Sequence, residues 1–210
     1  MTESEKNRRP LAVRGSRWAQ ALAKNLAQRE VPTPNQISLL SVAFALLGAL
    51  LLAFFPNTVG LILTALLIQL RLICNLLDGM VAVEGGKKTA NGALYNEVPD
   101  RVADSLLILA LGFAVGQPWL GWLGALLAAL TAYIRLLGGS LGLEQRFSGP
   151  MAKQHRMALL TFACLIGAIE WYQWQSQYVL WIAIIAIVIG SLLTCALRLR
   201  NISDELHGSK

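Results

Sequence analysis

Two long stretches of the chain, Ile37–Phe55 and Tyr178–Leu197, contain no charged residue. Each is long enough to cross the hydrocarbon core of a bilayer as an α-helix. Buried helices in a soluble protein are the alternative, but 55% of the residues are hydrophobic and the mean hydropathy is +0.54. Soluble domains of ordinary composition are less apolar. The sequence therefore predicts an all-α integral membrane protein.

The apolar segments and the turns between them predict six transmembrane helices. They are expected at residues 36–55, 58–83, 92–116, 118–142, 154–173 and 177–198. Together they form one transmembrane domain at 35–200, between a cytoplasmic tail with a juxtamembrane helix at 1–34 and a second cytoplasmic tail at 201–210. No internal repeat or soluble second domain is evident.

Charged residues are unevenly distributed over the ends of these segments. The turns near Pro56 and Gln117 carry no charge, and the turn near Gln173 holds only Glu170. Basic residues gather at the opposite ends: the N-terminal cluster, Lys87, Lys88, Arg146, Lys153, Arg156, Arg198 and Arg200. Because cytoplasmic loops of membrane proteins are enriched in Lys and Arg, both termini are predicted to be cytoplasmic.

The net charge of +6 and the pI of 9.6 admit nucleic acid as a partner. The basic residues lie beside membrane segments, however, so topology and anionic lipid explain them better, and no nucleic-acid partner is expected. The three cysteines, Cys74, Cys164 and Cys195, lie inside apolar segments without the spacing of metal ligands. We interpret them as small hydrophobic residues.

Residues 14–30 predict an amphipathic helix ahead of the first span. Trp18, Leu22 and Leu26 recur at a spacing of four, and the other positions include Arg14, Arg17, Lys24 and Arg29. Such a helix lies in the membrane interface with its cations toward lipid phosphates. A solvated charged helix is the alternative, and Trp18 favours the interface.

Oxygen-bearing side chains occur where the second and third spans meet. Asn75 and Asp78 are three residues apart and share one helix face. Positions at intervals of four share a face of the next helix: Gly92, Asn96, Asp100 and Asp104. The intervening Glu-Gly-Gly-Lys-Lys predicts a turn, which makes the two helices antiparallel neighbours. Carboxylate and amide oxygens would then converge, as a hard divalent cation requires.

These acidic residues could instead pair with Arg71 and Arg101 to hold the helices together. The expected pair of this kind is Arg101 with Asp104 or with Glu97. Pairing alone leaves the regular spacing unexplained, and ionisable residues within membrane spans are usually functional. A functional site is therefore favoured.

This stretch resembles the signature of the CDP-alcohol phosphotransferases, D-x2-D-G-x2-A-R-x8-G-x3-D-x3-D. Every spacing is kept, and the matched positions are Asn75, Asp78, Gly79, Ala82, Val83, Gly92, Asn96 and Asp100. Asn75 and Asn96 stand where the family usually has Asp, and Val83 where it has Arg. The chain thus resembles a variant subfamily with Asn at the first and third Asp positions.

The resemblance implies a Mg²⁺- or Mn²⁺-dependent transfer of a phosphatidyl group from CDP-diacylglycerol, or another CDP-linked donor, to a small polar alcohol, with release of CMP. It implies a metal site formed by Asn75, Asp78, Asn96 and Asp100, in which Asp100 is also the general base. The cytidine diphosphate would contact Asp78, Gly79, Ala82 and Gly92. The resemblance also implies a homodimer of six-helix subunits.

Cations flank the signature in sequence. Arg135 ends the fourth span, and Lys153 and Arg156 open the fifth. Topology alone would place basic residues there, but with the signature we expect all three to bind a phosphate of the substrates. Glycerol 3-phosphate is therefore the first acceptor to consider. The expected location is the bacterial inner membrane, with the active site facing the cytoplasm.

Two other functions remain open from the sequence. A catalytically silent relative would bind CDP-lipid and act as a partner of another lipid enzyme, which the two Asn substitutions would explain. A small transporter would also use intramembrane carboxylates, although no inverted repeat favours it.

Overall fold

The computed structural model describes residues 16–28, 31–86 and 91–208. Over these ranges the protein is entirely helical, with seven helices and no strand, which confirms the all-α fold class. The helices are α2 (Arg17–Ala27), α3 (Pro34–Phe54), α4 (Thr58–Glu84), α5 (Gly92–Ala114), α6 (Pro118–Ser140), α7 (Lys153–Trp174) and α8 (Tyr178–Gly208).

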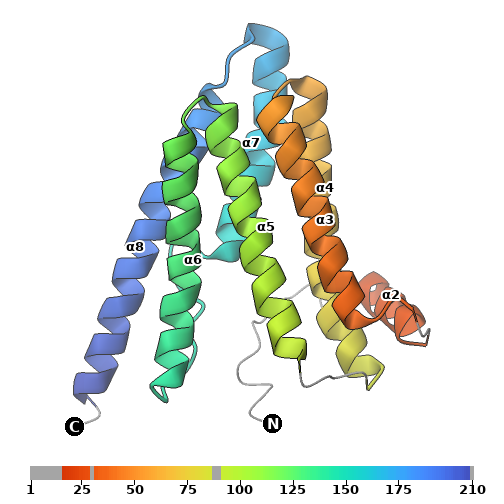
Figure 1. The fold of residues 1–210 in the computed structure, drawn as a ribbon, viewed down its shortest axis with the longest axis vertical. Coiled ribbons are helices and arrows are strands. Elements are labelled where there is room, and N and C mark those ends of the chain that lie inside the picture. The colour runs from red at the N-terminus through yellow and green to blue at the C-terminus, as the bar shows by residue number, and fades with distance from the viewer. Residues whose placement is uncertain (1–15, 29–30, 87–90, 209–210) are drawn as a thin grey trace.

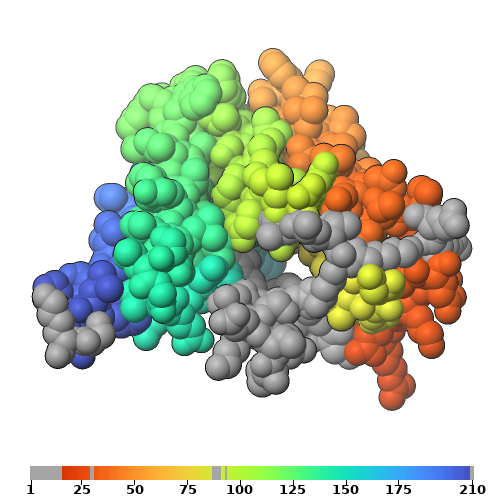
Figure 2. Space-filling model, turned by 60° about the horizontal axis from the view of Figure 1, so that its bottom comes forward, coloured from red at the N-terminus to blue at the C-terminus, as the bar shows by residue number. Residues whose placement is uncertain are grey.

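The six long helices form a closed ring. Helix α3 packs against α4, α4 against α7, α7 against α8, α8 against α6, α6 against α5, and α5 against α3. They converge at one end of the molecule and spread apart at the other, where α4, α6 and α8 end and α5 begins (Figure 1). We call this the wide end. Figure 2 turns it toward the viewer, with α6 and α8 on one side and α2 with the end of α4 on the other.

Five of the described helices are long and apolar enough to cross a membrane, namely α3, α4, α6, α7 and α8. Helix α5 coincides with the predicted third span but carries four charged residues within eight positions, namely Glu97, Asp100, Arg101 and Asp104. Helix α5 is therefore not among the five helices above, and the sixth span stays a prediction.

Two predicted boundaries need correction. Helix α8 continues to Gly208, so residues 201–208 of the predicted tail extend the last helix. The predicted helix at 14–30 is observed as α2, residues Arg17–Ala27. Several residues on which the predictions relied lie outside the described ranges: Arg14, Arg29, Glu30, Lys87 and Lys88.

Helix α2 lies against α4 through its small residues. Ala19 and Ala23 are fully buried in a cluster with residues of α3 and α4, whereas Trp18 is 50% exposed and Leu22 is 40% exposed. Trp18 and Leu22 of the predicted face therefore stay largely uncovered, whereas Leu26 of the same face is partly buried and packs against this cluster.

Side chains from nearby turns fix where helices begin. Thr33 accepts a hydrogen bond from the Gln36 amide, and the Gln36 side chain accepts one from the Thr33 amide, which is a capping box at the start of α3. Glu170 of α7 caps the N-terminus of α8. Its carboxylate accepts hydrogen bonds from the amides of Tyr178 at 2.7 Å and Val179 at 2.9 Å. A negative charge at a helix N-terminus is stabilising.

Candidate active site

The signature residues lie in the half of the bundle toward the wide end. Helix α4 supplies Asn75 and Asp78 near its C-terminal end, and α5 supplies Asn96 and Asp100 from its first turns. The first residue of α7, Lys153, reaches the same place. The sequence predicted that α4 and α5 are antiparallel neighbours, but each helix packs against α3 instead, and the two meet through the side chains of Asn75 and Asp100. The approach of α7 was visible in the sequence only as a nearby charge.

Asp100 is the centre of a group of donors. Asn75 Nδ2 donates a hydrogen bond to Asp100 Oδ1 at 2.7 Å. The Lys153 ammonium forms an ion pair with the same oxygen, and the Arg71 guanidinium lies 3.6 Å from it. Arg101 lies 3.7 Å from the second oxygen, Oδ2. One carboxylate thus connects α4, α5 and α7.

Asp78 is 6% exposed and is held by a third helix. Ser38 of α3 donates from its hydroxyl to Asp78 Oδ2 at 2.6 Å, and the Gly79 amide donates to Oδ1 at 2.5 Å. Asp78 also interacts electrostatically with Asp100 and Lys153. Ser38 was not predicted, because a lone serine in an apolar span has no distinguishing spacing.

The Asp104 carboxylate lies between two buried arginines and pairs with both. Its Oδ1 accepts from Arg71 at 2.7 Å, and its Oδ2 accepts from Arg156 at 3.0 Å. All three side chains are at most 3% exposed. The expected pair between Arg101 and Asp104 is wrong, because Arg71 and Arg156 occupy that carboxylate.

The alternative pair that the sequence predicted, Arg101 with Glu97, is observed at 3.7 Å. The Glu97 carboxylate also binds Arg135 of α6 at 2.7 Å. Arg135 in turn donates to the Gln145 side chain at 2.6 Å and lies over the Phe147 ring at 4.8 Å. Arg135 is therefore fixed between α5 and the segment that follows α6.

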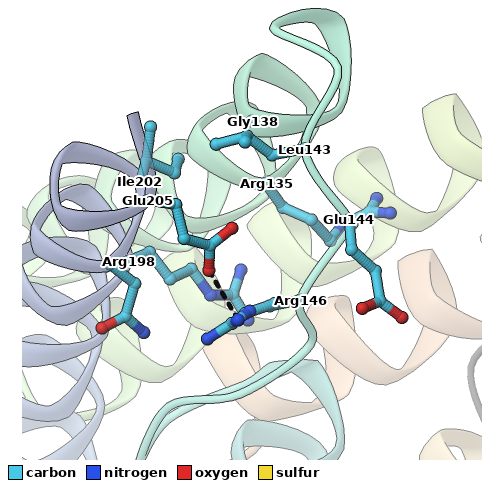
Figure 3. Close-up of a pocket in the computed structure, with 9 residues that line it drawn as sticks. Arg135, Gly138, Leu143, Glu144, Arg146, Arg198, Ile202 and Glu205 are labelled. Carbon is cyan, nitrogen blue, oxygen red and sulfur yellow. Dashed lines mark ion pairs between the residues drawn. The ribbon is translucent and has the colours of Figure 1, made fainter. Parts of the chain in front are cut away.

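A pocket opens beside Arg135, between α6, α8 and the segment that joins α6 to α7 (Figure 3). Arg135, Arg146 and Arg198 contribute three guanidinium groups to its lining. Arg146 forms an ion pair with Glu205 at 2.6 Å across it. The sequence prediction missed this pocket, because its residues come from distant parts of the chain.

Two of the other predicted site residues contact the cluster, since the Gly79 amide donates to Asp78 and Arg156 pairs with Asp104. Asn96 is exposed, and Gly79, Ala82 and Gly92 are half-buried. Arg156 is 1% exposed, and besides Asp104 it donates to the Met151 carbonyl at 2.7 Å. Its burial and these bonds favour a supporting role over direct contact with a substrate phosphate.

The donor set suits a hard divalent cation, although it is weakly charged. Within the described residues, no group of three or more His, Cys, Asp and Glu side chains is arranged to hold a metal ion. Two carboxylates and two amides, from Asp78, Asp100, Asn75 and Asn96, are oxygen donors of the kind that Mg²⁺ and Mn²⁺ accept. A cation is already seated on Asp100, in the form of the Lys153 ammonium. The residues therefore fit a divalent ion that takes this place.

Two sequence relatives each align with 147 residues of this chain. Inner membrane protein YnbA of Escherichia coli (strain K12) is 31% identical over 147 residues, 69% of this chain and 73% of that protein. A protein of Rubrobacter xylanophilus, named bifunctional IPC transferase and DIPP synthase, is 37% identical over 147 residues. That match covers 65% of this chain but 32% of the relative.

Crystal structures of phosphatidylinositol phosphate synthase (PgsA1) from Mycobacterium tuberculosis have the same fold. The form with CDP-DAG bound has a TM-score of 0.75 at 21% identity, over 89% of this chain and 94% of that chain. The complex with manganese and citrate has a TM-score of 0.74 at 20% identity, over 88% of both chains.

The family model for CDP-alcohol phosphatidyltransferases matches residues 31–194, which include the whole signature. This match confirms the resemblance found in the sequence. The protein therefore belongs to the CDP-alcohol phosphatidyltransferase family, whose members are enzymes that transfer phosphatidyl groups.

Proposed function

We propose that this protein transfers a phosphatidyl group from CDP-diacylglycerol to the hydroxyl of a small polar alcohol and releases CMP. The observation that carries the proposal is the meeting of Asn75 and Asp100 across α4 and α5 at 2.7 Å, because it brings the two halves of the family signature together. The M. tuberculosis synthase with CDP-DAG bound, which has the same fold, supports the choice of donor.

Asp100 is the proposed general base. It would accept the proton of the acceptor hydroxyl, which then attacks the phosphorus of the donor while CMP departs. The half-buried glycines Gly79 and Gly92 leave room for the cytidine diphosphate beside Asp78 and Ala82. Ser38 and the Gly79 amide orient the Asp78 carboxylate by the two hydrogen bonds that it accepts.

Asn75, Asp78, Asn96 and Asp100 would hold a Mg²⁺ or Mn²⁺ ion. When bound, such an ion neutralises the diphosphate and stabilises the leaving phosphate. The manganese complex of the M. tuberculosis synthase supports this choice of metals. Because Asn75 and Asn96 carry no charge, we propose a single ion at this site.

The acceptor is proposed to carry a phosphate, with glycerol 3-phosphate as the first candidate. The pocket beside Arg135 offers guanidinium groups of Arg146 and Arg198 as well, and planar guanidinium groups bind phosphate well. Lys153 pairs with Asp100, so we retain it as a substrate contact. Arg156 would act indirectly, since it holds Asp104.

In the membrane we propose six spans at residues 35–200, in which α5 joins the five apolar helices as a span. Both termini would lie in the cytoplasm. The wide end would face the cytoplasm, where CMP leaves. The exposed Trp18 and Leu22 of α2 would then lie in the membrane interface. A homodimer in the bacterial inner membrane completes the proposal, and the name of the E. coli relative supports this location.

The test is CMP release by the purified protein in detergent with CDP-diacylglycerol, Mg²⁺ or Mn²⁺ and a panel of alcohols. Asp100→Ala should abolish acceptor-dependent release, whereas Asp204→Ala, at a 70%-exposed position on α8, should retain it. Equal release by all three proteins, or release without an acceptor, would contradict the proposal.

A silent CDP-lipid-binding relative is the second candidate function. It is favoured by one observation: the charge of Asp100 is already balanced by Lys153, and its neighbour Asn75 adds none. Binding of CDP-diacylglycerol without CMP release, for every acceptor in the panel, would establish this function instead.

A further inference from the structure

We infer that Lys153 is the resident counter-ion of Asp100, and that a divalent cation binds this site by displacing the Lys153 ammonium. The inference rests on the proposed function, since it concerns the metal site of that function. It adds a competition between a side chain and the metal for one carboxylate.

The position of Lys153 is fixed by its helix. It is the first residue of α7 and is 9% exposed, and the preceding Ala152 is 1% exposed. Its ammonium pairs with Asp100 Oδ1 and interacts electrostatically with Asp78 and Asp104. A positive charge therefore already lies among the carboxylates that a metal would need.

A metal and this ammonium cannot share the site without a large cost. Charges of the same sign repel strongly at contact distance where water is scarce. The cluster offers only two carboxylates as candidate metal ligands, Asp78 and Asp100, which is too little negative charge for both cations. A lysine can leave, because its ammonium is a point charge on a flexible four-carbon stem.

Asn75 must rearrange in the same step. Its amide nitrogen faces Asp100 Oδ1 at 2.7 Å, so its amide oxygen points elsewhere. A carboxamide presents oxygen instead of nitrogen after a half-turn, and only the oxygen can ligate a cation. The observed arrangement is thus the one that suits Lys153, and the turned arrangement suits the metal.

The test measures Mn²⁺ affinity without donor or acceptor, from the electron paramagnetic resonance signal of free Mn²⁺. Lys153→Gln removes the competitor and should bind Mn²⁺ about tenfold more tightly than the unsubstituted protein. Arg200→Gln makes the same charge change at a 79%-exposed position and should leave the affinity unchanged. Asp100→Asn should lose Mn²⁺ binding.

An unchanged or weaker affinity of Lys153→Gln would overturn the inference. If the unsubstituted protein binds Mn²⁺ and releases CMP in that case, the proposed function stands and only the displacement is wrong. If no protein in the set binds Mn²⁺ and none releases CMP, the proposed function fails with it.

A second measurement uses the unsubstituted protein and so does not depend on the folding of a variant. The amine of Lys153 is acylated with an amine-specific reagent, and the modified fraction is followed by mass spectrometry with and without Mn²⁺. Displacement from Asp100 frees the amine, so its labelling should accelerate when Mn²⁺ is added. Labelling that is unchanged or slowed by Mn²⁺ would overturn the inference.

Discussion

Asp104→Asn should be among the most destabilising single substitutions in the bundle. The Asp104 carboxylate is 3% exposed and pairs with Arg71 at 2.7 Å and with Arg156 at 3.0 Å. Removing its charge leaves two guanidinium groups buried without their nearest counter-ion. Within the described residues, the buried Nε atoms of both arginines already lack a hydrogen-bond partner. The substitution would therefore add to donors that are unsatisfied in the unsubstituted protein.

The magnitude follows from the partners that remain. Loss of one member of a buried ion pair costs about 3–5 kcal/mol. Two pairs are lost here, but Arg71 keeps Asp100 at 3.6 Å and Arg156 keeps the Met151 carbonyl at 2.7 Å. We therefore expect about 3–5 kcal/mol in total rather than twice that amount.

The assay is unfolding in mixed micelles with increasing dodecyl sulfate, followed by tryptophan fluorescence. The matched control is Asp204→Asn, which breaks a 3.7 Å pair with Arg200 whose side chains are 70% and 79% exposed. Such a surface pair contributes about 0–1 kcal/mol. If Asp104→Asn changes the free energy of unfolding no more than this control does, the buried cluster does not stabilise the fold as argued.

Three further substitutions test separate features. Glu170→Ala removes the carboxylate that caps α8 and should cost about 3 kcal/mol of stability in the same assay, and a loss below about 1 kcal/mol would contradict the capping role. Gly112→Ala places a Cβ 2.6 Å from the α6 backbone and should cost about 1–3 kcal/mol, whereas Gly208→Ala, with nothing within 4 Å, should not. Asn75→Asp adds a carboxylate beside Asp100, so it should tighten Mn²⁺ binding about tenfold or more in calorimetry; unchanged affinity would refute a role for charge.

Spacing along single helices was enough to place the signature residues on their helices. Residues that recur every four positions share a helix face whatever the fold, which is why Asn96 and Asp100 could be placed on one face of α5. The predicted packing of α4 against α5 was wrong, because each helix packs against α3 instead, and the two meet through the side chains of Asn75 and Asp100. The long apolar runs gave the all-α class for the same local reason.

Contacts between distant segments were not predictable from spacing. Asp104 of α5 pairs with Arg156 of α7, and nothing in the local sequence of either helix indicates that partner. The same holds for Ser38 with Asp78, and for the pocket between α6 and α8. Topology, ion pairing and substrate binding use the same basic residue types, so the sequence alone does not distinguish these roles.

The charges of α5 are matched by cations of other helices in the ring, which explains how so polar a helix can lie within an apolar bundle. Along α5, Glu97 pairs with Arg135 of α6, Asp100 with Lys153 of α7, and Asp104 with arginines of α4 and α7. Together these pairs fix the position of α5 relative to α4, α6 and α7, at the desolvation cost that buried charges carry.

The cations that pair with Asp104 and with Asp100 differ in kind, and the difference agrees with the roles proposed for the two carboxylates. Asp104, the most buried of the three carboxylates, is held by two planar guanidinium groups, which bind carboxylates in a fixed geometry. Asp100, which is 13% exposed, has as its nearest cation an ammonium on a flexible stem. The counter-ions of Asp104 are thus held in a fixed geometry, whereas the counter-ion of Asp100 can be exchanged. A site that must release its counter-ion when a metal arrives needs this difference between two carboxylates one helical turn apart.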